Sequence, residues 1–201
     1  QGVVRREIGG DNLYEDLQID YKLGELTLED LKNILTGEPS EAYPVTLGSS
    51  ENDNVLFFWS GHGTQQGWKW KDDEDLNADF ARALFSDMQF RKMFAIVETC
   101  YSGVVAQDCT GIPGLLMMTA ANPYETSKAD AFDNELQAYL SNTFTSSILS
   151  WFESNPDTVI RDLYLHAFDK TNGSHVMVYN PEYYGNLYWN DMSEYYPKSV
   201  N

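Results

Sequence analysis

Two glycine-flanked motifs hold the residues of this sequence that could do covalent chemistry. His62 lies in residues 60–63 (SGHG), and Cys100 lies in residues 98–103 (ETCYSG). A cysteine thiol is only slightly ionised at neutral pH, because its unperturbed pKa is about 8.5. A neighbouring imidazole can take the thiol proton and later protonate the leaving amine. The pair predicts nucleophilic catalysis, with Cys100 as nucleophile and His62 as general base.

The glycines of the two motifs fit the same chemistry. Gly63 allows the backbone to approach a substrate closely, and its N–H could bind an oxyanion together with the N–H of Cys100. Gly103 permits a tight exit from the turn that carries the nucleophile. A cysteine after a strand is usually a small buried apolar residue. A cysteine and a histidine that each end a strand beside glycine nevertheless favour a functional pair.

The remaining cysteine and histidines are interpreted as structural. Cys109 stands in a loop before residues 111–114 (GIPG), and His166 and His175 are expected to be packing or surface residues. Two cysteines make no disulfide framework, and a bridge between them would consume the nucleophile. The spacings of zinc sites are absent, as are phosphate-binding and dinucleotide-binding glycine motifs. We therefore expect no metal and no cofactor.

Apolar runs alternate with helical patterns along the chain. The runs span residues 55–59, 93–97, 115–118 and 175–179. Continuous apolar runs of this length suit strands that are buried on both faces of a parallel sheet, and their alternation with helices predicts an α/β fold. His62 and Cys100 follow the first two runs, and catalytic groups in such sheets gather at the carboxyl ends of strands. If these strands are parallel neighbours, the two side chains face one cleft.

Side-chain spacing places four helices around these strands. Thr27 is expected to cap the first helix, with Asp30 three residues on and Gly37 at the end. The other three helices are indicated by apolar residues that repeat about every four positions. These residues are Leu76, Phe80, Leu84 and Met88; Leu136, Leu140, Phe144, Ile148 and Phe152; and Val159, Leu163 and Ala167.

Composition and charge narrow the functional classes. The chain has 201 residues, of which 42% are apolar, and this is enough to fold one domain with a sizeable core. Its net charge of -18 argues against nucleic acid and anionic membrane surfaces as partners, because both require positive charge. No apolar run reaches the roughly 18 residues of a membrane helix, so we expect no membrane insertion. Residues 72–75 (DDED) are interpreted as a solvated loop rather than a calcium loop, since the ligand spacing is absent.

Both motifs resemble those of legumain-like cysteine peptidases, which form peptidase family C13 of clan CD and are relatives of the caspases. The SGHG and ETCYSG stretches alone are typical of the wider clan. Two longer stretches are similar to legumains specifically, namely residues 119–127 (TAANPYETS) and residues 173–179 (GSHVMVY). The resemblance runs along nearly the whole chain. It implies a single peptidase domain over residues 1–201, folded as a caspase-like α/β/α sandwich with a mostly parallel central sheet.

The resemblance also implies an activity and a set of site residues. Members cleave peptide bonds after Asn, and in some cases Asp, through a Cys-His dyad and an acyl-enzyme intermediate. His62 and Cys100 match the dyad, and Gly63 matches the glycine of the oxyanion hole. Four residues match positions around the P1 side-chain pocket: Glu98, Thr126, Ser127 and Asn142. Asn142 stands where legumains have an aspartate, so this pocket would carry less negative charge.

Legumain-like peptidases begin with a strand, a helix and a strand before the stretch that matches residues 1–4. The resemblance places a further pocket arginine and a histidine-orienting asparagine in that segment. We therefore expect this chain to be the larger product of a cleaved precursor, bound to a smaller upstream chain. Self-cleavage of such a zymogen would form part of its activation. The same analogy implies peptide or protein substrates and a secreted, periplasmic or lysosome-like compartment.

Two other functions stay open on the sequence alone. A transpeptidase or transamidase would use the same dyad up to the acyl-enzyme and differ only in the acceptor, an amine instead of water. A catalytically inactive binding module on the same fold is the third interpretation. The intact His62 and Cys100 pair with its glycines argues against inactivity, and the sequence favours an endopeptidase.

Overall fold

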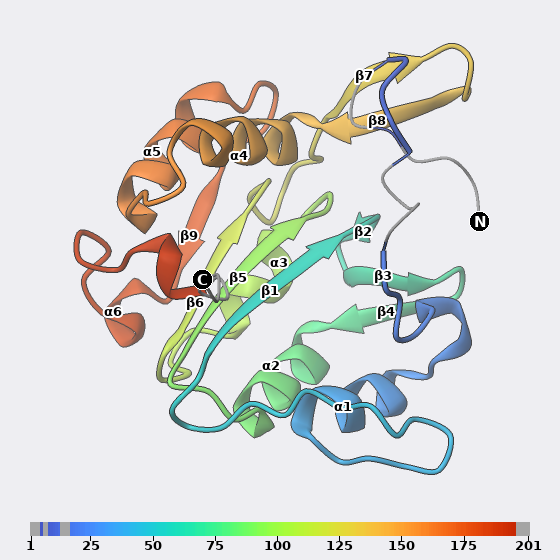
Figure 1. Ribbon diagram of the computed structural model, residues 1–201, viewed down its shortest axis with the longest axis vertical. Helices are drawn as coiled ribbons and strands as arrows, with labels where there is room; N and C mark the ends of the chain where they lie inside the picture. Colours follow the sequence, from blue (N-terminus) through green and yellow to red (C-terminus); the bar gives the residue numbers. More distant parts are fainter. Residues whose placement is uncertain (1–4, 6–7, 13–16, 196–201) are drawn as a thin grey trace.

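Four strands form the central sheet, in the order β1-β5-β6-β9 (Figure 1). A computed structural model of the chain describes residues 5, 8–12 and 17–195. β1 (Asn54–Ser60), β5 (Lys92–Glu98) and β6 (Leu115–Thr119) are parallel, and β9 (Met177–Tyr179) pairs with β6 in the antiparallel direction. The four apolar runs of the sequence therefore contribute the strands of one sheet, as predicted, with one reversed strand. The fourth strand begins at Met177, so the prediction that His175 opens it is wrong.

Helices cover both faces of this sheet (Figure 1). α1 (Leu28–Thr36), α2 (Ala78–Asp87) and α3 (Gly103–Asp108) contribute to the apolar cluster on one face. α4 (Thr143–Ser154) and α5 (Ile160–Lys170) contribute to the cluster on the other. The expected α/β sandwich with a mostly parallel central sheet is confirmed.

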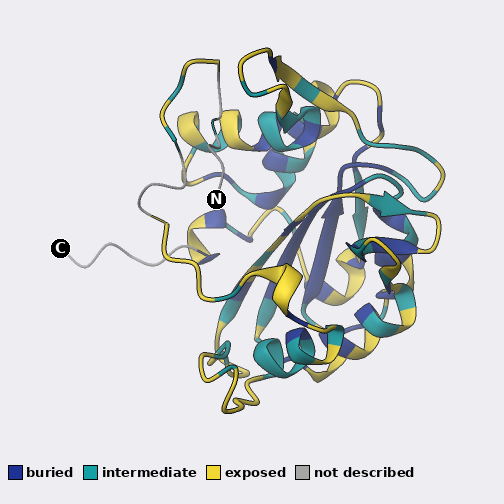
Figure 2. Ribbon diagram, turned by 90° about the vertical axis from the view of Figure 1, so that its right-hand side faces the viewer, coloured by how far each residue is buried: buried dark blue, intermediate teal, exposed yellow. Residues whose placement is uncertain are grey.

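Strand β5 supplies side chains to both clusters, because successive residues of a strand point to opposite faces. Met93, Ala95 and Val97 lie in the cluster with α1, α2 and α3, while Phe94 and Ile96 lie in the cluster with α4 and α5. Figure 2 shows the buried strands between the two helical layers. The chain that leads to the candidate nucleophile is thus fixed from both sides.

The edge strand β1 is covered on one face only. Val55 and Trp59 are buried, whereas Leu56 is 38% and Phe58 is 51% exposed. Within the described ranges, no strand pairs with the outer edge of β1. The sequence predicted burial on both faces, and this is correct for β5 and β6 but wrong for β1.

Two smaller sheets were not predicted from the sequence. β2 (Gly63–Thr64), β3 (Gly67–Lys71) and β4 (Glu74–Asn77) form a three-stranded antiparallel sheet that follows β1. β7 (Ala129–Asp133) and β8 (Ala138–Asn142) form a hairpin that projects from the sandwich (Figure 1). Both sheets contribute to the region around the carboxyl ends of β1 and β5.

The first predicted helix has the expected ends. Thr27 accepts a hydrogen bond from the N–H of Asp30, and the Asp30 carboxylate accepts one from the N–H of Thr27. Gly37 ends α1 in the left-handed conformation, with a φ of 84°. The hydrogen bonds from Thr27 lower the pKa of the Asp30 carboxyl. The cap and the glycine together fix both ends of α1.

Two other helix predictions began too early. Leu76 lies in β4, not in the helix. The Asn77 side chain accepts the N–H of Phe80 and caps α2, which therefore begins at Ala78. Leu136 and Leu140 lie in the β7–β8 hairpin, and α4 begins only at Thr143. In both places an apolar residue of the preceding strand continues the four-residue spacing of the helix. The apolar spacing therefore predicted helix for residues that belong to the preceding strand or hairpin.

The remaining elements are short. They are η1 (Leu23–Glu25), α6 (Pro181–Tyr184) and η2 (Met192–Tyr195). Across the parts of the chain that the structure describes, no helix has the length and apolar character needed to span a membrane.

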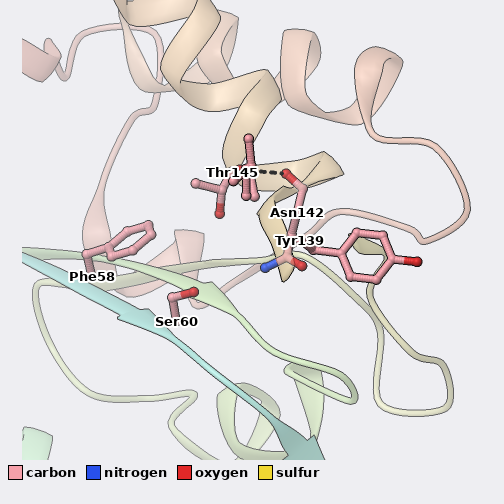
Figure 3. Close-up of a pocket in the computed structure, with 7 residues that line it drawn as sticks. Phe58, Ser60, Tyr139, Asn142 and Thr145 are labelled. Carbon is pink, nitrogen blue, oxygen red and sulfur yellow. Dashed lines mark hydrogen bonds between the residues drawn. The ribbon is translucent and has the colours of Figure 1, made fainter. Parts of the chain in front are cut away.

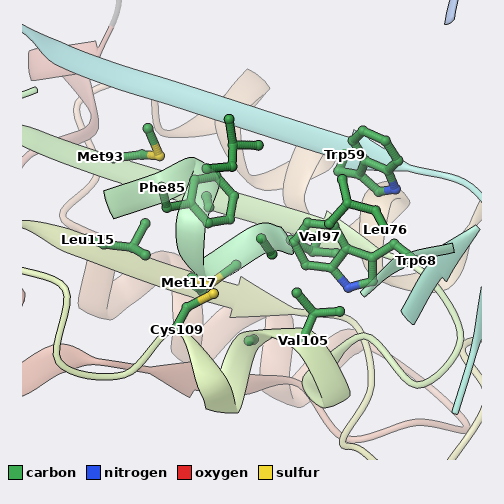
Figure 4. Close-up of a cluster of buried hydrophobic side chains, with 14 of the residues drawn as sticks. Trp59, Trp68, Leu76, Phe85, Met93, Val97, Val105, Cys109, Leu115 and Met117 are labelled. Carbon is green, nitrogen blue, oxygen red and sulfur yellow. The ribbon is translucent and has the colours of Figure 1, made fainter. Parts of the chain in front are cut away.

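Cys109 lies inside the apolar cluster between the sheet and α1, α2 and α3 (Figure 4). It is fully buried and not bonded to Cys100. Burial raises the pKa of its thiol to about 12. Cys109 is therefore a small core residue, in agreement with its interpretation as structural.

Candidate active site

The candidate nucleophile lies in a tight turn between β5 and α3. Cys100 is partly exposed, and the next residue, Tyr101, has a φ of 52° in the left-handed region. A non-glycine residue there is strained unless its surroundings hold it. The N–H of Tyr101 donates to the Glu125 carbonyl at 2.8 Å, and the N–H of Gly103 donates to the Ala121 carbonyl at 3.2 Å. The loop after β6 therefore holds the turn by its backbone.

Side chains hold the same turn from two further directions. The Ser102 hydroxyl exchanges hydrogen bonds with the backbone of Ala121, both at 3.0 Å. The indole N–H of Trp68, from β3, donates to the Ser102 carbonyl at 3.3 Å. A Cβ on Gly103 would lie 2.3 Å from the Tyr179 hydroxyl, so only glycine fits there without a shift of its neighbours. The predicted need for Gly103 has a steric cause.

The histidine motif lies directly beside this turn. β1 and β5 are parallel neighbours with Ser60 opposite Glu98, so the expected meeting of the two strand ends is confirmed. A Cβ on Gly63 would lie 2.0 Å from the carbonyl oxygen of Cys100. The residue after His62 is therefore in close contact with the candidate nucleophile's own backbone. The His62 residue is exposed, and its carbonyl accepts the N–H of Lys69 at 2.9 Å.

Glu98 is a fully buried carboxyl at the end of β5, two residues before Cys100. Its Oε2 accepts hydrogen bonds from the N–H and the hydroxyl of Thr145, both at 3.1 Å. Burial raises its pKa to about 7, although hydrogen bonding to Thr145 and Ser127 opposes the rise. Among the described residues, Oε1 has no hydrogen-bond partner of ordinary geometry. An unpaired buried carboxyl oxygen is costly and is a strong candidate for contact with a polar ligand group.

A cavity of about 230 Å³ opens against Thr145, the residue that hydrogen-bonds the Glu98 carboxyl. It is lined by Phe58, Ser60, Tyr139, Leu140, Ser141, Asn142 and Thr145. Figure 3 shows Phe58 and Ser60 of β1 across from Asn142 and Thr145, where β8 meets α4. The cavity thus brings the predicted pocket residue Asn142 near the strand end that carries Glu98.

The two hydroxyl residues predicted for the pocket take different positions. Ser127 Oγ lies 3.9 Å from the Cys100 sulfur, and the Ser127 carbonyl oxygen lies 4.0 Å from it. Ser127 therefore lies between the candidate nucleophile and Glu98. Thr126 instead accepts a hydrogen bond from the Lys128 ammonium at 2.9 Å. Of the four predicted pocket residues, Asn142 lines the cavity, whereas Glu98, Thr126 and Ser127 do not.

Sequence reasoning missed the residues that support the site. Glu125 and His175 are joined by a side-chain contact of 2.8 Å, and the Trp68 indole donates a hydrogen bond to the turn that carries Cys100. The alternation of Trp68 and Trp70 with lysines, before an acidic turn, was a signal for the β3–β4 hairpin. Glu125 and His175 lie in the two stretches that resemble legumains, and this was the available signal for them.

The acidic stretch at residues 72–75 forms the turn between β3 and β4 and the first two residues of β4. Asp75 accepts the Thr64 hydroxyl at 2.8 Å and pairs with the Lys69 ammonium at 3.1 Å. Within the described ranges, no group of three or more His, Cys, Asp or Glu residues could hold a metal ion. The chemistry available at this site is that of a thiol, an imidazole and a carboxyl.

A mostly parallel α/β sandwich with adjacent cysteine and histidine turns at its carboxyl edge defines the caspase-like class of fold. The chain belongs to the peptidase C13 family, whose model matches residues 1–193. It is 30% identical to a putative GPI-anchor transamidase of Caenorhabditis elegans, over 72% of this chain and 47% of that protein. It is 27% identical to legumain of Mus musculus, over 89% of this chain and 43% of that protein. The chain thus spans less than half the length of these relatives.

Proposed function

We propose that the chain carries the active site of a cysteine endopeptidase that cleaves after Asn. The observation that carries this proposal is the position of Cys100 between two groups. On one side its carbonyl is in close contact with Gly63, beside His62. On the other side its sulfur lies 3.9 Å from Ser127, next to the buried Glu98. A thiol between a histidine-bearing turn and a polar pocket suits attack on a peptide bond that follows a polar side chain.

The proposed reaction has two steps. His62 takes the proton of Cys100, the thiolate attacks the scissile carbonyl carbon, and the N–H groups of Gly63 and Cys100 stabilise the oxyanion. The C–N bond then breaks as the protonated His62 gives its proton to the leaving amine. This leaves a thioester on Cys100. Water, deprotonated by His62, then attacks the thioester carbon. The C–S bond breaks, the acid product leaves, and His62 returns the proton to the Cys100 thiolate.

Glu98 is proposed to bind the P1 side chain. An ionised Glu98 could accept a hydrogen bond from the amide of an Asn substrate through its unpaired Oε1. The same charge would repel an Asp side chain. Because burial raises the pKa of Glu98 to about 7, the carboxyl becomes neutral in mildly acidic solution. Cleavage after Asp should then rise relative to cleavage after Asn as the pH falls.

The test is a peptide series that varies only the P1 residue, assayed with the wild type and Cys100→Ala. We expect cleavage after Asn, weaker cleavage after Asp, and none from the variant. Cleavage after Arg, Lys or Phe with none after Asn or Asp would contradict the proposed specificity. Cleavage by Cys100→Ala would contradict the mechanism.

A transamidase is the second candidate, because several relatives are named GPI-anchor transamidase. The acyl-enzyme on Cys100 would then be attacked by an amine instead of water. Adding an amine nucleophile to the peptide assay distinguishes the two functions. Ligated product in large excess over acid would favour the transamidase. An inactive module would give neither product and would resist labelling of Cys100 by a peptide-based thiol inhibitor.

We also propose that a smaller upstream chain of the same precursor pairs with β1. Two observations support this pairing. Among the described residues, no strand pairs with the outer edge of β1, and Phe58 on β1 is half-exposed. The test is to express the full precursor, denature the purified protein and weigh its chains. A second fragment that is absent when the precursor carries Cys100→Ala would support both pairing and self-cleavage. A single folded, active 201-residue chain would contradict it.

A further inference from the structure

Two segments that lie 50 residues apart in the sequence are joined at Glu125. The N–H of His175 donates to Glu125 Oε1 at 2.7 Å, and His175 Nδ1 lies 2.8 Å from Glu125 Oε2. Beside this pair, the Ser174 hydroxyl donates to the Ala120 carbonyl at 2.7 Å. The loop that follows β6 is therefore tied to the segment that leads into β9.

Glu125 also contacts the nucleophile turn. Its backbone carbonyl accepts the N–H of Tyr101, the residue after Cys100, at 2.8 Å. Its Oε1 accepts a second hydrogen bond, from the N–H of Asn122 at 3.1 Å. One residue thus joins its own loop, the lead into β9 and the turn that presents the thiol.

The charge of Glu125 suits this role. Burial alone would raise the pKa of its carboxyl, but hydrogen bonds from His175 and Asn122 outweigh burial and lower the pKa. An ionised carboxylate that accepts several N–H groups makes stronger hydrogen bonds than a neutral acceptor would. The carboxylate therefore holds the backbone of Glu125 in place, and with it the carbonyl that accepts the N–H of Tyr101.

The position of that carbonyl has two consequences for the site. Tyr101 has a φ of 52°, a conformation that a non-glycine residue keeps only when its surroundings enforce it. Ser127 follows Glu125 by two residues and lies 3.9 Å from the Cys100 sulfur. A shift of Glu125 would therefore move the thiol and the hydroxyl beside it together.

We propose that Glu125 is a positioning residue for Cys100 and that His175 is its partner. This inference rests on the proposed function, in which Cys100 is the nucleophile. The pair does not touch the reacting atoms. It holds the turn in the geometry that presents the thiol to the scissile carbonyl.

The experiment compares His175→Leu, His175→Asn and Glu125→Gln in the otherwise unchanged protein. An Asn side chain keeps an N–H donor the same number of bonds from the backbone as Nδ1, whereas Leu has none. We expect His175→Leu and Glu125→Gln to lower kcat by about tenfold or more, since small misplacements of a nucleophile have effects of that size or larger. His175→Asn should recover most of kcat. Glu51→Gln, in an exposed loop, is the matched control and should behave as the wild type.

Two measurements separate positioning from general support of the fold. Each kcat is expressed per Cys100 that reacts in an active-site titration, so unfolded protein does not count. The rate of Cys100 alkylation by a small neutral reagent is also measured. It needs no peptide substrate, and Cys109 does not compete because it is fully buried.

A changed alkylation rate in His175→Leu, restored in His175→Asn, supports the proposal even if no peptide is cleaved. In that case the proposed endopeptidase function is contradicted, but the positioning role of Glu125 and His175 is not. Equal kcat per reactive thiol and equal alkylation rates in the wild type, His175→Leu and His175→Asn would overturn the inference. If Glu125→Gln does not fold, the two His175 variants still decide.

Discussion

The turn that carries Cys100 and the turn that carries His62 lie side by side, but the chain supports them very differently. The Cys100 turn follows a strand that is buried on both faces, and backbone and side-chain hydrogen bonds hold it from Ala121, Glu125 and Trp68. His62 follows the edge strand β1, and its residue is exposed. The described part of this chain therefore holds the proposed nucleophile by many contacts, whereas it holds the proposed general base through its backbone.

This difference separates two tasks of a catalytic pair. A nucleophile must sit within a fraction of an ångström of the attack geometry, so rigid support is needed throughout the reaction. A general base needs its imidazole oriented, and that support can come from a covering segment or from the substrate. The contact between Gly63 and the Cys100 carbonyl is where the two turns meet. Substitutions can disturb the Cys100 turn, this contact and the neighbouring pocket separately.

The largest expected effect is on the nucleophile itself. Cys100→Ala should lower kcat/KM by at least about a thousandfold, because residues that act as one catalytic unit cause losses of this size when removed. Its melting temperature should stay close to that of the wild type, since Cys100 lies in a partly exposed turn. Cys109→Ala is the matched control and should keep most of the activity of correctly folded protein. An inactive Cys109→Ala beside an active Cys100→Ala would reverse the assignment.

The second prediction breaks the link between the two turns. Gly63→Ala places a methyl group where a Cβ would lie 2.0 Å from the Cys100 carbonyl oxygen, so the two turns must separate. We expect kcat/KM to fall about a hundredfold, in line with an ångström-scale misplacement of catalytic groups. Gly61→Ala is the control, because its Cβ would meet nothing within 4 Å. Equal losses in both variants would show that the contact with Cys100 is not the cause.

The third prediction concerns the buried carboxyl beneath the nucleophile. Glu98 has a folded-state pKa of about 7, above the ordinary value of 4.5 expected in the unfolded chain. Between these pH values the unfolded state loses the proton first, so wild-type stability falls as the pH rises. The cost of the charge should reach about 3 kcal/mol above neutral pH. Glu98→Gln has no proton to lose, so its stability relative to the wild type should rise by about that amount.

Urea unfolding of both proteins at about pH 5 and about pH 8 measures this change. Taking the difference between variant and wild type removes the titration of all other groups that the two share. Glu51→Gln, an exposed carboxyl replaced in the same way, should show no such pH-dependent difference. A constant difference between Glu98→Gln and wild type at both pH values would refute a raised pKa at Glu98.

The smallest expected effect is on specificity. Asn142→Asp adds a negative charge to the cavity that Asn142 lines. At neutral pH we expect cleavage after Asp to fall by about tenfold relative to cleavage after Asn, because the charges repel. Asn52→Asp makes the same charge change in an exposed loop and should leave the ratio unchanged. An unaltered ratio in Asn142→Asp would place the P1 side chain elsewhere.

Much of the sandwich was predictable because its signals are local. The run at residues 93–97 is apolar at every position, which is typical of a segment buried on both faces. The equally apolar run at residues 55–59 gave the same signal although β1 is an edge strand. Thr27 and Gly37 mark the ends of α1 by hydrogen bonding and backbone conformation that involve near neighbours. The small sheet at β2–β4 was missed because short strands with alternating Trp and Lys give a weak signal.

The candidate site was predictable only in part. His62, Cys100 and their glycines follow strand ends, so spacing and strand order predict that they meet. Asn142 was assigned through the resemblance and does line the cavity, whereas Thr126 bonds Lys128 instead. The contact between Glu125 and His175 joins residues that no local rule relates. Such contacts depend on how the loop after β6 packs against the segment that leads into β9, and this is a property of the tertiary structure.

The burial of Cys109 has a consequence for oxidation. Peroxide converts a reactive cysteine to a sulfenic acid, which a neighbouring thiol can capture as a disulfide before further oxidation. The sequence contains two cysteines, and the second is fully enclosed in the core with a pKa of about 12. Within these 201 residues, Cys100 therefore has no accessible thiol that could resolve a sulfenic acid. A sulfenic acid on Cys100 would have to be reduced by a thiol that lies outside these residues before it is oxidised further to the sulfinic acid.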